Sequence, residues 1–198
     1  MKKCIGSKLN ACYDCKKIKY IVFVLGLLLG IVGYNSTNKP LAAQWTLEEC
    51  IGVAMPELDY ASDNKMIFHG DFGLFIYDLS GMKIINSLDL KSIGCNAIQG
   101  SNYCDISVSQ DGNIIQLHPM ENNKMYIYDV EKNKLMLTDY KPMKEPFKVS
   151  INDNPSGSVS WGTVEFENGD IGYLECEGST INELYYVVGS TKYKLFSK

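Results

Sequence analysis

The stretch DISVSQDGNIIQLH, residues 105–118, is the clearest guide to the fold, because two apolar runs flank the turn Gln110–Asn113. An Asp-Gly pair between apolar runs is among the strongest short-range signals for a β-hairpin. The first run is Asp105–Ser109 and the second is Ile114–His118. We therefore predict two antiparallel strands that are joined by a tight turn.

Short apolar runs separated by turn residues continue on both sides of this hairpin. The chain has 13 Tyr and 7 Phe, and aromatic residues fit the half-buried surface of a sheet. The predicted fold class is therefore all-β, with antiparallel strands. The further predicted strands are Lys65–His69, Gly73–Asp78, Lys83–Ile85, Lys124–Asp129, Lys134–Leu137, Ser160–Phe166, Ile171–Leu174, Glu183–Val188 and Lys192–Phe196.

One short helix is expected ahead of the strands. Thr46-Leu47-Glu48-Glu49 fits a capping box, with Thr46 as N-cap and Glu49 three residues later. Pro56 would end this helix, because proline lacks the backbone N–H that a helix needs. We therefore expect a short helix and linker over residues 44–59, followed by a β-rich domain over residues 60–198.

The β-rich region repeats one pattern about three times. An apolar strand ending in Tyr77-Asp78 is matched by one ending in Tyr128-Asp129, and Leu184-Tyr185-Tyr186 takes the same place in a third copy. A turn and another strand precede each of them. A period near 40–50 residues with about four strands is typical of propeller blades. The three turns are Asp63-Asn64, Asp111-Gly112 and Asn168-Gly169.

Two segments, Ser107–Ile115 and Tyr126–Val130, resemble the repeats of β-propeller proteins of the WD40-like kind. The resemblance covers residues 60–198 in three imperfect copies, and it implies antiparallel propeller-like blades. Propellers normally close with four or more blades. A propeller fragment, an oligomeric ring and a plain antiparallel sandwich therefore all remain open.

A second resemblance rests on Leu88–Cys95 and Gln99–Cys104. These stretches are similar to the extracytoplasmic β-rich regions of clostridial sensor metallopeptidases of the BlaR1 type. Those enzymes carry His-Glu-x-x-His, whereas His69 and His118 stand in no such motif. The resemblance therefore implies a sensor-associated region without protease activity.

Residues 1–43 have the order of an export signal. A lysine-rich stretch precedes the apolar block Ile21–Gly33, and Pro40-Leu41-Ala42-Ala43 follows as a possible cleavage point. The block is shorter than the roughly 20 residues that a membrane-spanning helix needs. We expect a signal peptide, with an uncleaved N-terminal membrane anchor as the alternative. Both place the remainder outside the cytoplasm, either secreted or anchored, because lysines stay on the cytoplasmic side.

Charge changes at the same boundary. Residues 1–43 carry seven lysines and one aspartate, for +6, whereas residues 44–198 carry twelve lysines and twenty-two acidic residues, for −10. The chain has no arginine. Nucleic-acid binding depends on cations that neutralise phosphates, so no nucleic-acid partner is expected. The membrane is expected as a partner only through the N-terminal segment.

Four cysteines follow the apolar block: Cys50, Cys95, Cys104 and Cys176. An even number in an exported domain allows two disulfides in three possible pairings. Cys95 and Cys104 are close enough in sequence to close a small loop, which would leave Cys50 with Cys176. Four buried thiols are the alternative. No metal site is predicted at Cys12 and Cys15, because zinc wants four ligands and no histidine is near.

The chemistry-bearing residues form no catalytic pattern. His69 and His118 each end a predicted strand, and we expect each to bond a loop carbonyl. The pairs Glu165/Glu167 and Glu175/Glu177 share strand faces, where they are expected to be solvated and not to bind Ca²⁺ or serve a hydrolase. Gly-x-Ser-x-Gly is absent. We predict no catalytic, metal-binding or cofactor-binding residue.

The function that fits these features is a non-catalytic binding or sensing module outside the cytoplasm. Its expected partner is a protein or peptide. Two alternatives stay open, namely an exported hydrolase that uses the acidic residues and an accessory protein of a membrane sensor.

Overall fold

The computed structural model describes residues 55–95, 104–120, 122–150, 162–177 and 181–197. All of them belong to the second of two compact units, Leu41–Lys198. The predicted leader and the predicted helix after Thr46 lie outside the described residues. Among the described residues, no helix has both the length and the apolar character needed to cross a membrane.

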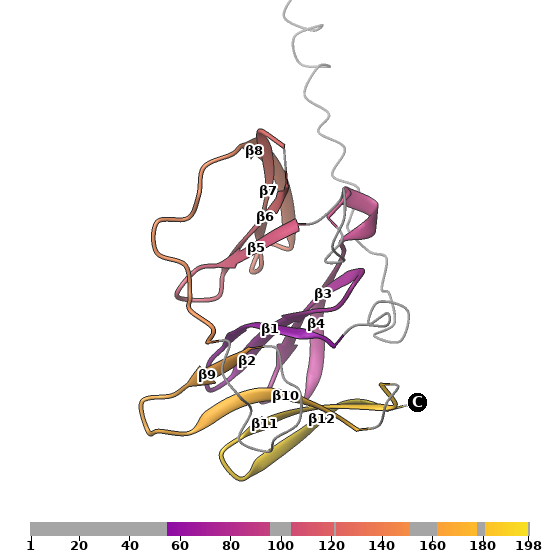
Figure 1. Ribbon diagram of the computed structural model, residues 1–198, viewed down its shortest axis with the longest axis vertical. Coiled ribbons are helices and arrows are strands. Elements are labelled where there is room, and N and C mark those ends of the chain that lie inside the picture. Colours follow the sequence, from indigo (N-terminus) through magenta and orange to yellow (C-terminus); the bar gives the residue numbers. More distant parts are fainter. Residues whose placement is uncertain (1–54, 96–103, 121, 151–161, 178–180, 198) are drawn as a thin grey trace, which may run out of the picture. The chain divides into compact units, whose positions relative to one another are not determined.

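Three four-stranded antiparallel sheets make up the described part of the chain, so the all-β prediction is confirmed (Figure 1). In each sheet, consecutive strands pair as a meander. Sheet 1 is β1 (Glu57–Ala61), β2 (Lys65–His69), β3 (Gly73–Asp78) and β4 (Lys83–Asp89). Sheet 2 is β5 (Cys104–Val108), β6 (Ile114–Pro119), β7 (Lys124–Asp129) and β8 (Lys134–Asp139). Sheet 3 is β9 (Thr163–Glu165), β10 (Ile171–Glu177), β11 (Glu183–Val188) and β12 (Thr191–Ser197).

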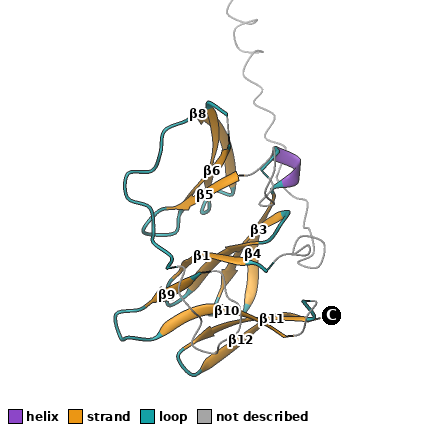
Figure 2. Cartoon of the chain, in the orientation of Figure 1, coloured by secondary structure: helices purple, strands orange, loops and turns teal. Residues whose placement is uncertain are grey.

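Helix is nearly absent from this part of the chain, as Figure 2 shows. Within the described residues the single helical element is the 3₁₀ turn η1 (Lys91–Ile93), which follows sheet 1. Gly94 ends it: its backbone is left-handed, with φ 71°, and its N–H donates to the carbonyl of Lys91. The chain therefore makes a tight turn between the end of sheet 1 and the start of sheet 2.

Most strand predictions hold, and four match the structure end to end: β2, β3, β7 and β11. β4 is longer than predicted because its pairing with β3 continues to Asp89. β9 runs from Thr163 to Glu165, and the predicted start at Ser160-Trp161 lies outside the described residues. β1 was not predicted as a strand, and it lies partly within the segment expected to be a linker.

The repeated Tyr-Asp ends have a structural cause. The carboxylate of Asp78, at the end of β3, accepts a hydrogen bond of 3.0 Å from the backbone N–H of Ser80. Asp129, at the end of β7, accepts one of 3.0 Å from the N–H of Lys132. Each aspartate therefore closes the turn to the fourth strand of its sheet, as Asx turns commonly do.

Sheet 1 is covered on both faces. Alternate residues of β3 belong to different cores: Phe75 and Tyr77 pack with residues of sheet 3, whereas Leu74 and Ile76 pack with residues of sheet 2. The sheet 3 side of the first core includes Val164, Leu174, Leu184 and Tyr186. The sheet 2 side of the second core includes Val108, Ile115, Leu117 and Tyr128.

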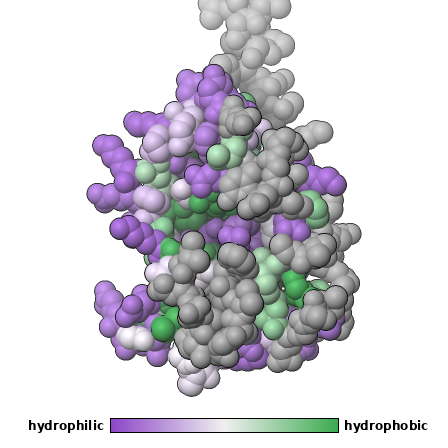
Figure 3. Space-filling model, in the orientation of Figure 1, coloured by the Kyte–Doolittle hydropathy of each residue, from purple (hydrophilic) through white to green (hydrophobic). Residues whose placement is uncertain are grey.

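The first strand of sheet 1 meets the first strands of both other sheets. β1 contacts β5 of sheet 2 and both β9 and β10 of sheet 3. No closed barrel or ring of strands is formed within the described ranges. On the face that Figure 3 draws, hydrophilic residues cover much of the described surface, and hydrophobic residues gather in a few small areas.

The two-sided core of sheet 1 predicts that neighbouring residues of β3 are equally sensitive to truncation. Phe75→Ala should lower the free energy of unfolding by about 3–5 kcal/mol, and Ile76→Ala by about 2–5 kcal/mol. Both side chains are fully buried, at 0% exposure, but in different cores. Denaturant unfolding of the full chain measures both changes.

Leu137→Ala is the control, because this apolar side chain on β8 is 60% exposed. It should change the free energy of unfolding by no more than about 0.5 kcal/mol. If one face of β3 were solvated, only one of the two β3 variants would lower the free energy of unfolding. That result would refute the two-sided core.

Candidate functional site

A β-bulge in β1 begins the candidate site. Leu58 pairs with Phe68 and Tyr60 pairs with Ile67, so Asp59 is the extra residue between them. The bulge reverses the usual alternation of side chains. Leu58 consequently enters the core shared with sheet 3, and Tyr60 enters the core shared with sheet 2.

Asp59 uses this position to pair with His69, the last residue of β2. Nδ1 of His69 lies 2.8 Å from Oδ2 of Asp59, and both side chains are about one-tenth exposed. On the other side of the ring, Nε2 lies 4.0 Å from a carboxylate oxygen of Glu57. His69 is thus held among acidic groups. The sequence predicts a bond to a loop carbonyl instead, and within the described ranges the ring makes none.

The acidic surroundings raise the pKa of His69. Burial acts first and lowers it, but the charge of Asp59, its hydrogen bond and the charges of Glu57 and Asp71 outweigh burial. The net pKa is therefore above the ordinary histidine value. The site favours an imidazolium ion, in which Nδ1–H donates to Asp59.

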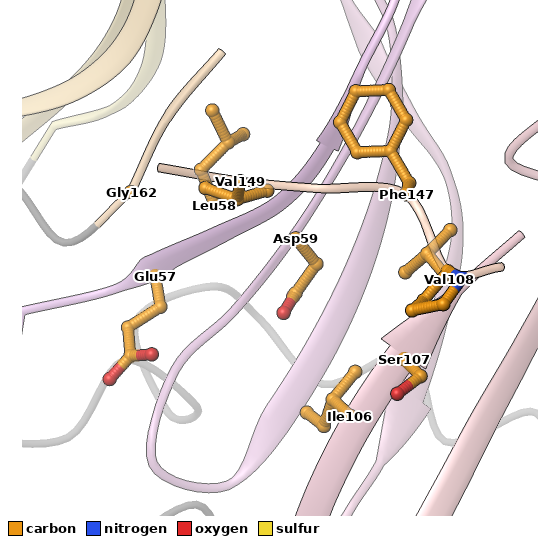
Figure 4. A pocket seen from close by; sticks show the side chains of 10 residues that line it. Glu57, Leu58, Asp59, Ile106, Ser107, Val108, Phe147, Val149 and Gly162 are labelled. Carbon is orange, nitrogen blue, oxygen red and sulfur yellow. The ribbon is translucent and has the colours of Figure 1, made fainter. Parts of the chain in front are cut away.

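A pocket of about 320 Å³ lies beside this pair, between β1 and β5. Figure 4 shows the carboxylates of Glu57 and Asp59 on the same side of β1, with Ile106 and Ser107 of β5 nearby. The volume is at the small end of the range for ligand sites, about 300–1,000 Å³. The lining residues are Glu57, Leu58, Asp59, Ile106, Ser107, Val108, Pro146, Phe147, Val149 and Gly162.

One wall of the pocket is the segment Pro146–Ser150, which we call the strap. The backbone N–H of Phe147 donates to the carbonyl of Val108 in β5 over 2.7 Å. Ser150 and Thr163 of β9 exchange two backbone hydrogen bonds of 2.8 and 2.9 Å. The strap thus pairs, as an extended segment, with the first strand of two different sheets.

The pocket joins apolar walls to negative charge. Six of its lining residues are apolar side chains from β1, β5 and the strap, and two are carboxylates. No lysine is among the lining residues. Gly162 also lines the pocket. A Cβ at this position would lie 2.9 Å from the carbonyl oxygen of Leu58 and 2.7 Å from Val149, so the close approach of these residues requires glycine. Such a site suits an apolar group that carries or adjoins a positive charge.

Cys95 and Cys104 come together beside the site. They are 0% and 2% exposed and belong to the core shared by sheets 1 and 2. Both are free thiols in the structure. A hydrogen bond with Cys95, followed by burial, raises the pKa of the Cys104 thiol, and the charge of Asp59 adds to this. The predicted Cys95–Cys104 disulfide has its partners in place, and it stays a prediction.

The other predicted pairing involves Cys176, because Cys50 lies outside the described residues. Cys176 is partly buried near the end of β10 and is also a free thiol. Burial and the charge of Glu175 raise its pKa to about 11. The Cys50–Cys176 disulfide therefore remains a prediction.

His118 behaves as the sequence predicts. Its Nε2 donates to the backbone carbonyl of Asn122 over 2.8 Å, and its ring stacks on Tyr140 with centroids 3.7 Å apart. His69 and His118 have separate sets of partners, in sheet 1 and sheet 2. The two histidines do not form a joint site.

Of the two predicted acidic pairs, Glu175/Glu177 stands on one strand, β10, and Glu165/Glu167 does not share a strand. β9 ends at Glu165, so Glu167 lies in the following turn and not on the same strand. Glu175 forms an ion pair of 3.0 Å with Lys192, while the side chain of Glu177 lies outside the described part. Among the described residues, no group of three His, Cys, Asp or Glu side chains is arranged to hold a metal ion.

Sequence reasoning missed the pocket itself. The bulge at Asp59 breaks the alternation on which strand prediction depends, and the strap carries no strand-like pattern in Lys144–Ser150. The one usable signal was the charge of Glu57-Leu58-Asp59 directly before an apolar strand.

No protein-family model matches the chain, and no curated protein matches it either. The candidate site therefore rests on its own geometry.

The acidic environment of His69 predicts a measurable titration. In the variant His118→Gln, His69 is the only histidine of the chain, so its NMR signal is unambiguous. Its midpoint should lie above about 6.5, the ordinary value, and Asp59→Asn should move it down. The stabilisation of the fold by the charged pair of Asp59 and His69 should be complete below about pH 6.5. It should disappear as the pH rises through the pKa of His69 in the folded protein.

Ser107→Ala is the matched control for this titration, since it changes the pocket without removing a charge. Its midpoint should equal that of the parent. A midpoint below pH 6.5, or a midpoint that Asp59→Asn leaves unchanged, would rule out that the acidic neighbours raise the pKa of His69.

The two adjacent thiols predict a disulfide under oxidising conditions. Protein isolated without reductant should be lighter by two hydrogens, and a peptide map should join Cys95 to Cys104. The disulfide closes a short loop, so its reduction should lower the free energy of unfolding by about 2–3 kcal/mol. Mass spectrometry after thiol alkylation, with Cys104→Ser as control, measures the bond. Alkylation of both thiols in protein that was kept under oxidising conditions and not reduced would contradict it.

Proposed function

We propose that this chain is a non-catalytic binding module outside the cytoplasm, and that its pocket between β1 and β5 holds a basic, partly apolar segment of a protein or peptide partner. The observation that carries the proposal is the combination of six apolar side chains with two carboxylates, that of Glu57 and that of Asp59, which shares its charge with His69. The small volume of the pocket fits one side chain of the partner, with the residues next to it, better than a large cofactor.

The strand edges beside the pocket support an extended partner. β1 and β5 each stand first in the order of their sheet, so each has a side that pairs with no strand of that sheet. Extended segments bind such edges through backbone hydrogen bonds. The strap already pairs in this way with Val108 of β5 and Thr163 of β9, which supports the binding of an extended chain at edges of this kind.

The arrangement around His69 favours binding over catalysis. Within the described residues, no Ser, Thr or Cys side chain is hydrogen-bonded to its imidazole, whose partners are carboxylates. A general base must lie within hydrogen-bond reach of the group that it activates. The hydrolase alternative also loses support at Glu175, which is neutralised by Lys192.

The location and architecture are part of the same proposal. The lysine-rich leader with its short apolar block supports export, either with cleavage or with an anchor. The three meanders, whose first strands meet at β1, support propeller-like blades. A membrane sensor is one class of partner that the proposal covers.

Charge reversal at the pocket tests the proposal. The probes are fluorescent, acetylated peptides of sequence VKVKVK and VEVEVE, and the full chain should bind only the first. Glu57→Lys should weaken that binding by about three- to tenfold, because an exposed charge pair contributes up to ~1 kcal/mol. Fluorescence anisotropy at low and high salt measures the affinity.

Asp139→Lys is the matched control, because it makes the same change of charge on β8 at a side chain that is 86% exposed. It should leave the affinity within about twofold of the parent, apart from a general charge effect that salt screens. Equal binding of both peptides, or equal losses in both variants, would overturn the proposed site.

A further inference from the structure

A second cavity of about 400 Å³ lies between sheet 1 and sheet 3, apart from the pocket at β5. Sheet 1 contributes residues from the β1–β2 turn and the end of β3. Sheet 3 contributes the β9–β10 turn and the strands β11 and β12. The lining residues are Ser62, Asp63, Leu79, Phe166, Glu167, Asn168, Asp170, Tyr186, Val188 and Tyr193.

The hydroxyl of Tyr186 is unsatisfied in this region. The side chain is 0% exposed, and among the described residues its Oη is the one buried side-chain polar atom without a hydrogen-bond partner. Buried hydroxyls nearly always have a partner, so an exception calls for an explanation. The hydroxyl stays protonated, because burial and the neighbours Tyr193 and Asp63 raise its pKa.

The hydroxyl of Tyr186 lies among side chains that also line the cavity. Its ring stacks on Tyr193, with centroids 6.1 Å apart. A Cβ built on Gly172 would collide with the hydroxyl and would lie 3.0 Å from Phe166. Phe166, Tyr193 and Asp63 all line the cavity. Glycine at position 172 thus leaves the room that the Tyr186 hydroxyl occupies beside Phe166.

The charge of the cavity selects the ligand. Three carboxylates line it, from Asp63, Glu167 and Asp170, and no lysine or histidine lies among the lining residues. Asp170 accepts a hydrogen bond of 2.8 Å from the side chain of Asn168, which fixes its position. Carboxylates beside tyrosine and phenylalanine rings favour an organic cation over an anion or a neutral molecule.

We propose that this cavity binds a primary alkylammonium group, such as the end of a lysine side chain or of a polyamine. The ammonium donates one hydrogen bond to the Tyr186 hydroxyl, which accepts it through a lone pair. Asp63 and Asp170 balance its charge, and its methylene groups lie against Phe166 and Tyr193. The inference is independent of the pocket at β5.

Titration of the full chain with butylammonium chloride, followed by two-dimensional NMR, tests the site. We expect saturable shifts at Gly172 and Gly189, and weaker binding at high salt. Tyr186→Phe should weaken binding about tenfold, because it removes the acceptor and keeps the ring. Asp63→Asn, a second variant on the exposed rim of the cavity, should weaken it about threefold and reduce the salt dependence.

Tyr185→Phe is the matched control. It makes the same substitution one residue earlier, where the hydroxyl bonds to Glu183, and it should leave the affinity unchanged. Glu57→Lys should also leave it unchanged, which separates this site from the pocket at β5. Methyl glucoside serves as the neutral probe.

Three results would overturn the inference. They are no saturable shifts with butylammonium, equal affinities for Tyr186→Phe and Tyr185→Phe, and binding of methyl glucoside in place of butylammonium. The last result would identify a carbohydrate site.

Discussion

The burial of both faces of sheet 1 is the constraint on which the rest of the described structure depends. Met66, Ile67 and Phe68 of β2 and Leu74, Phe75 and Ile76 of β3 are all 0% exposed. A sheet with two apolar faces cannot stand in water alone, so it needs a neighbour on each side. Sheets 2 and 3 are those neighbours, and each then requires only one apolar face of its own.

Two apolar faces also create a problem of register. A slip of one residue normally moves apolar side chains into water and is costly, but in β2 and β3 it would exchange one apolar face for the other. Register must therefore be set outside the strand interiors. The hydrogen bond from the N–H of Ser80 to Asp78 fixes the β3–β4 turn. The bonds between Ser62 and Lys65 fix the β1–β2 turn.

The bulge at Asp59 connects this core to the candidate site. By placing Leu58 and Tyr60 in opposite cores, it lets the edge strand β1 serve both neighbouring sheets. The extra residue carries a carboxylate, which binds His69 at the end of the next strand. One local irregularity thus satisfies the packing of sheet 1 and also positions an acidic group at the pocket.

This dependence explains what the sequence could and could not predict. The strands β2, β3, β7 and β11 were predicted to the residue, because an apolar run bounded by turn residues is a local signal. β1 was missed because Pro56 and the bulge disturb its short pattern. The two cavities arise where residues more than 40 positions apart meet, such as Glu57 with Ile106 or Asp63 with Tyr186. No sequence pattern within a single strand predicts such long-range contacts.

The outer face of sheet 3 bears on whether three blade-like sheets close into a ring. Alternation along β10, β11 and β12 places Glu175, Tyr185, Lys192 and Lys194 on the face opposite the core. Lys192 bonds to Glu175, Lys194 bonds to Glu183, and Lys192 lies 4.0 Å from the centre of the Tyr185 ring. A ring would cover this face with another sheet and remove these charges from water, at a cost that their pairing does not reliably offset. Of the three sheets that the structure describes, sheet 1 alone has two apolar faces, and it is placed between the other two. The distribution of charge therefore favours an open set of three sheets over a closed ring.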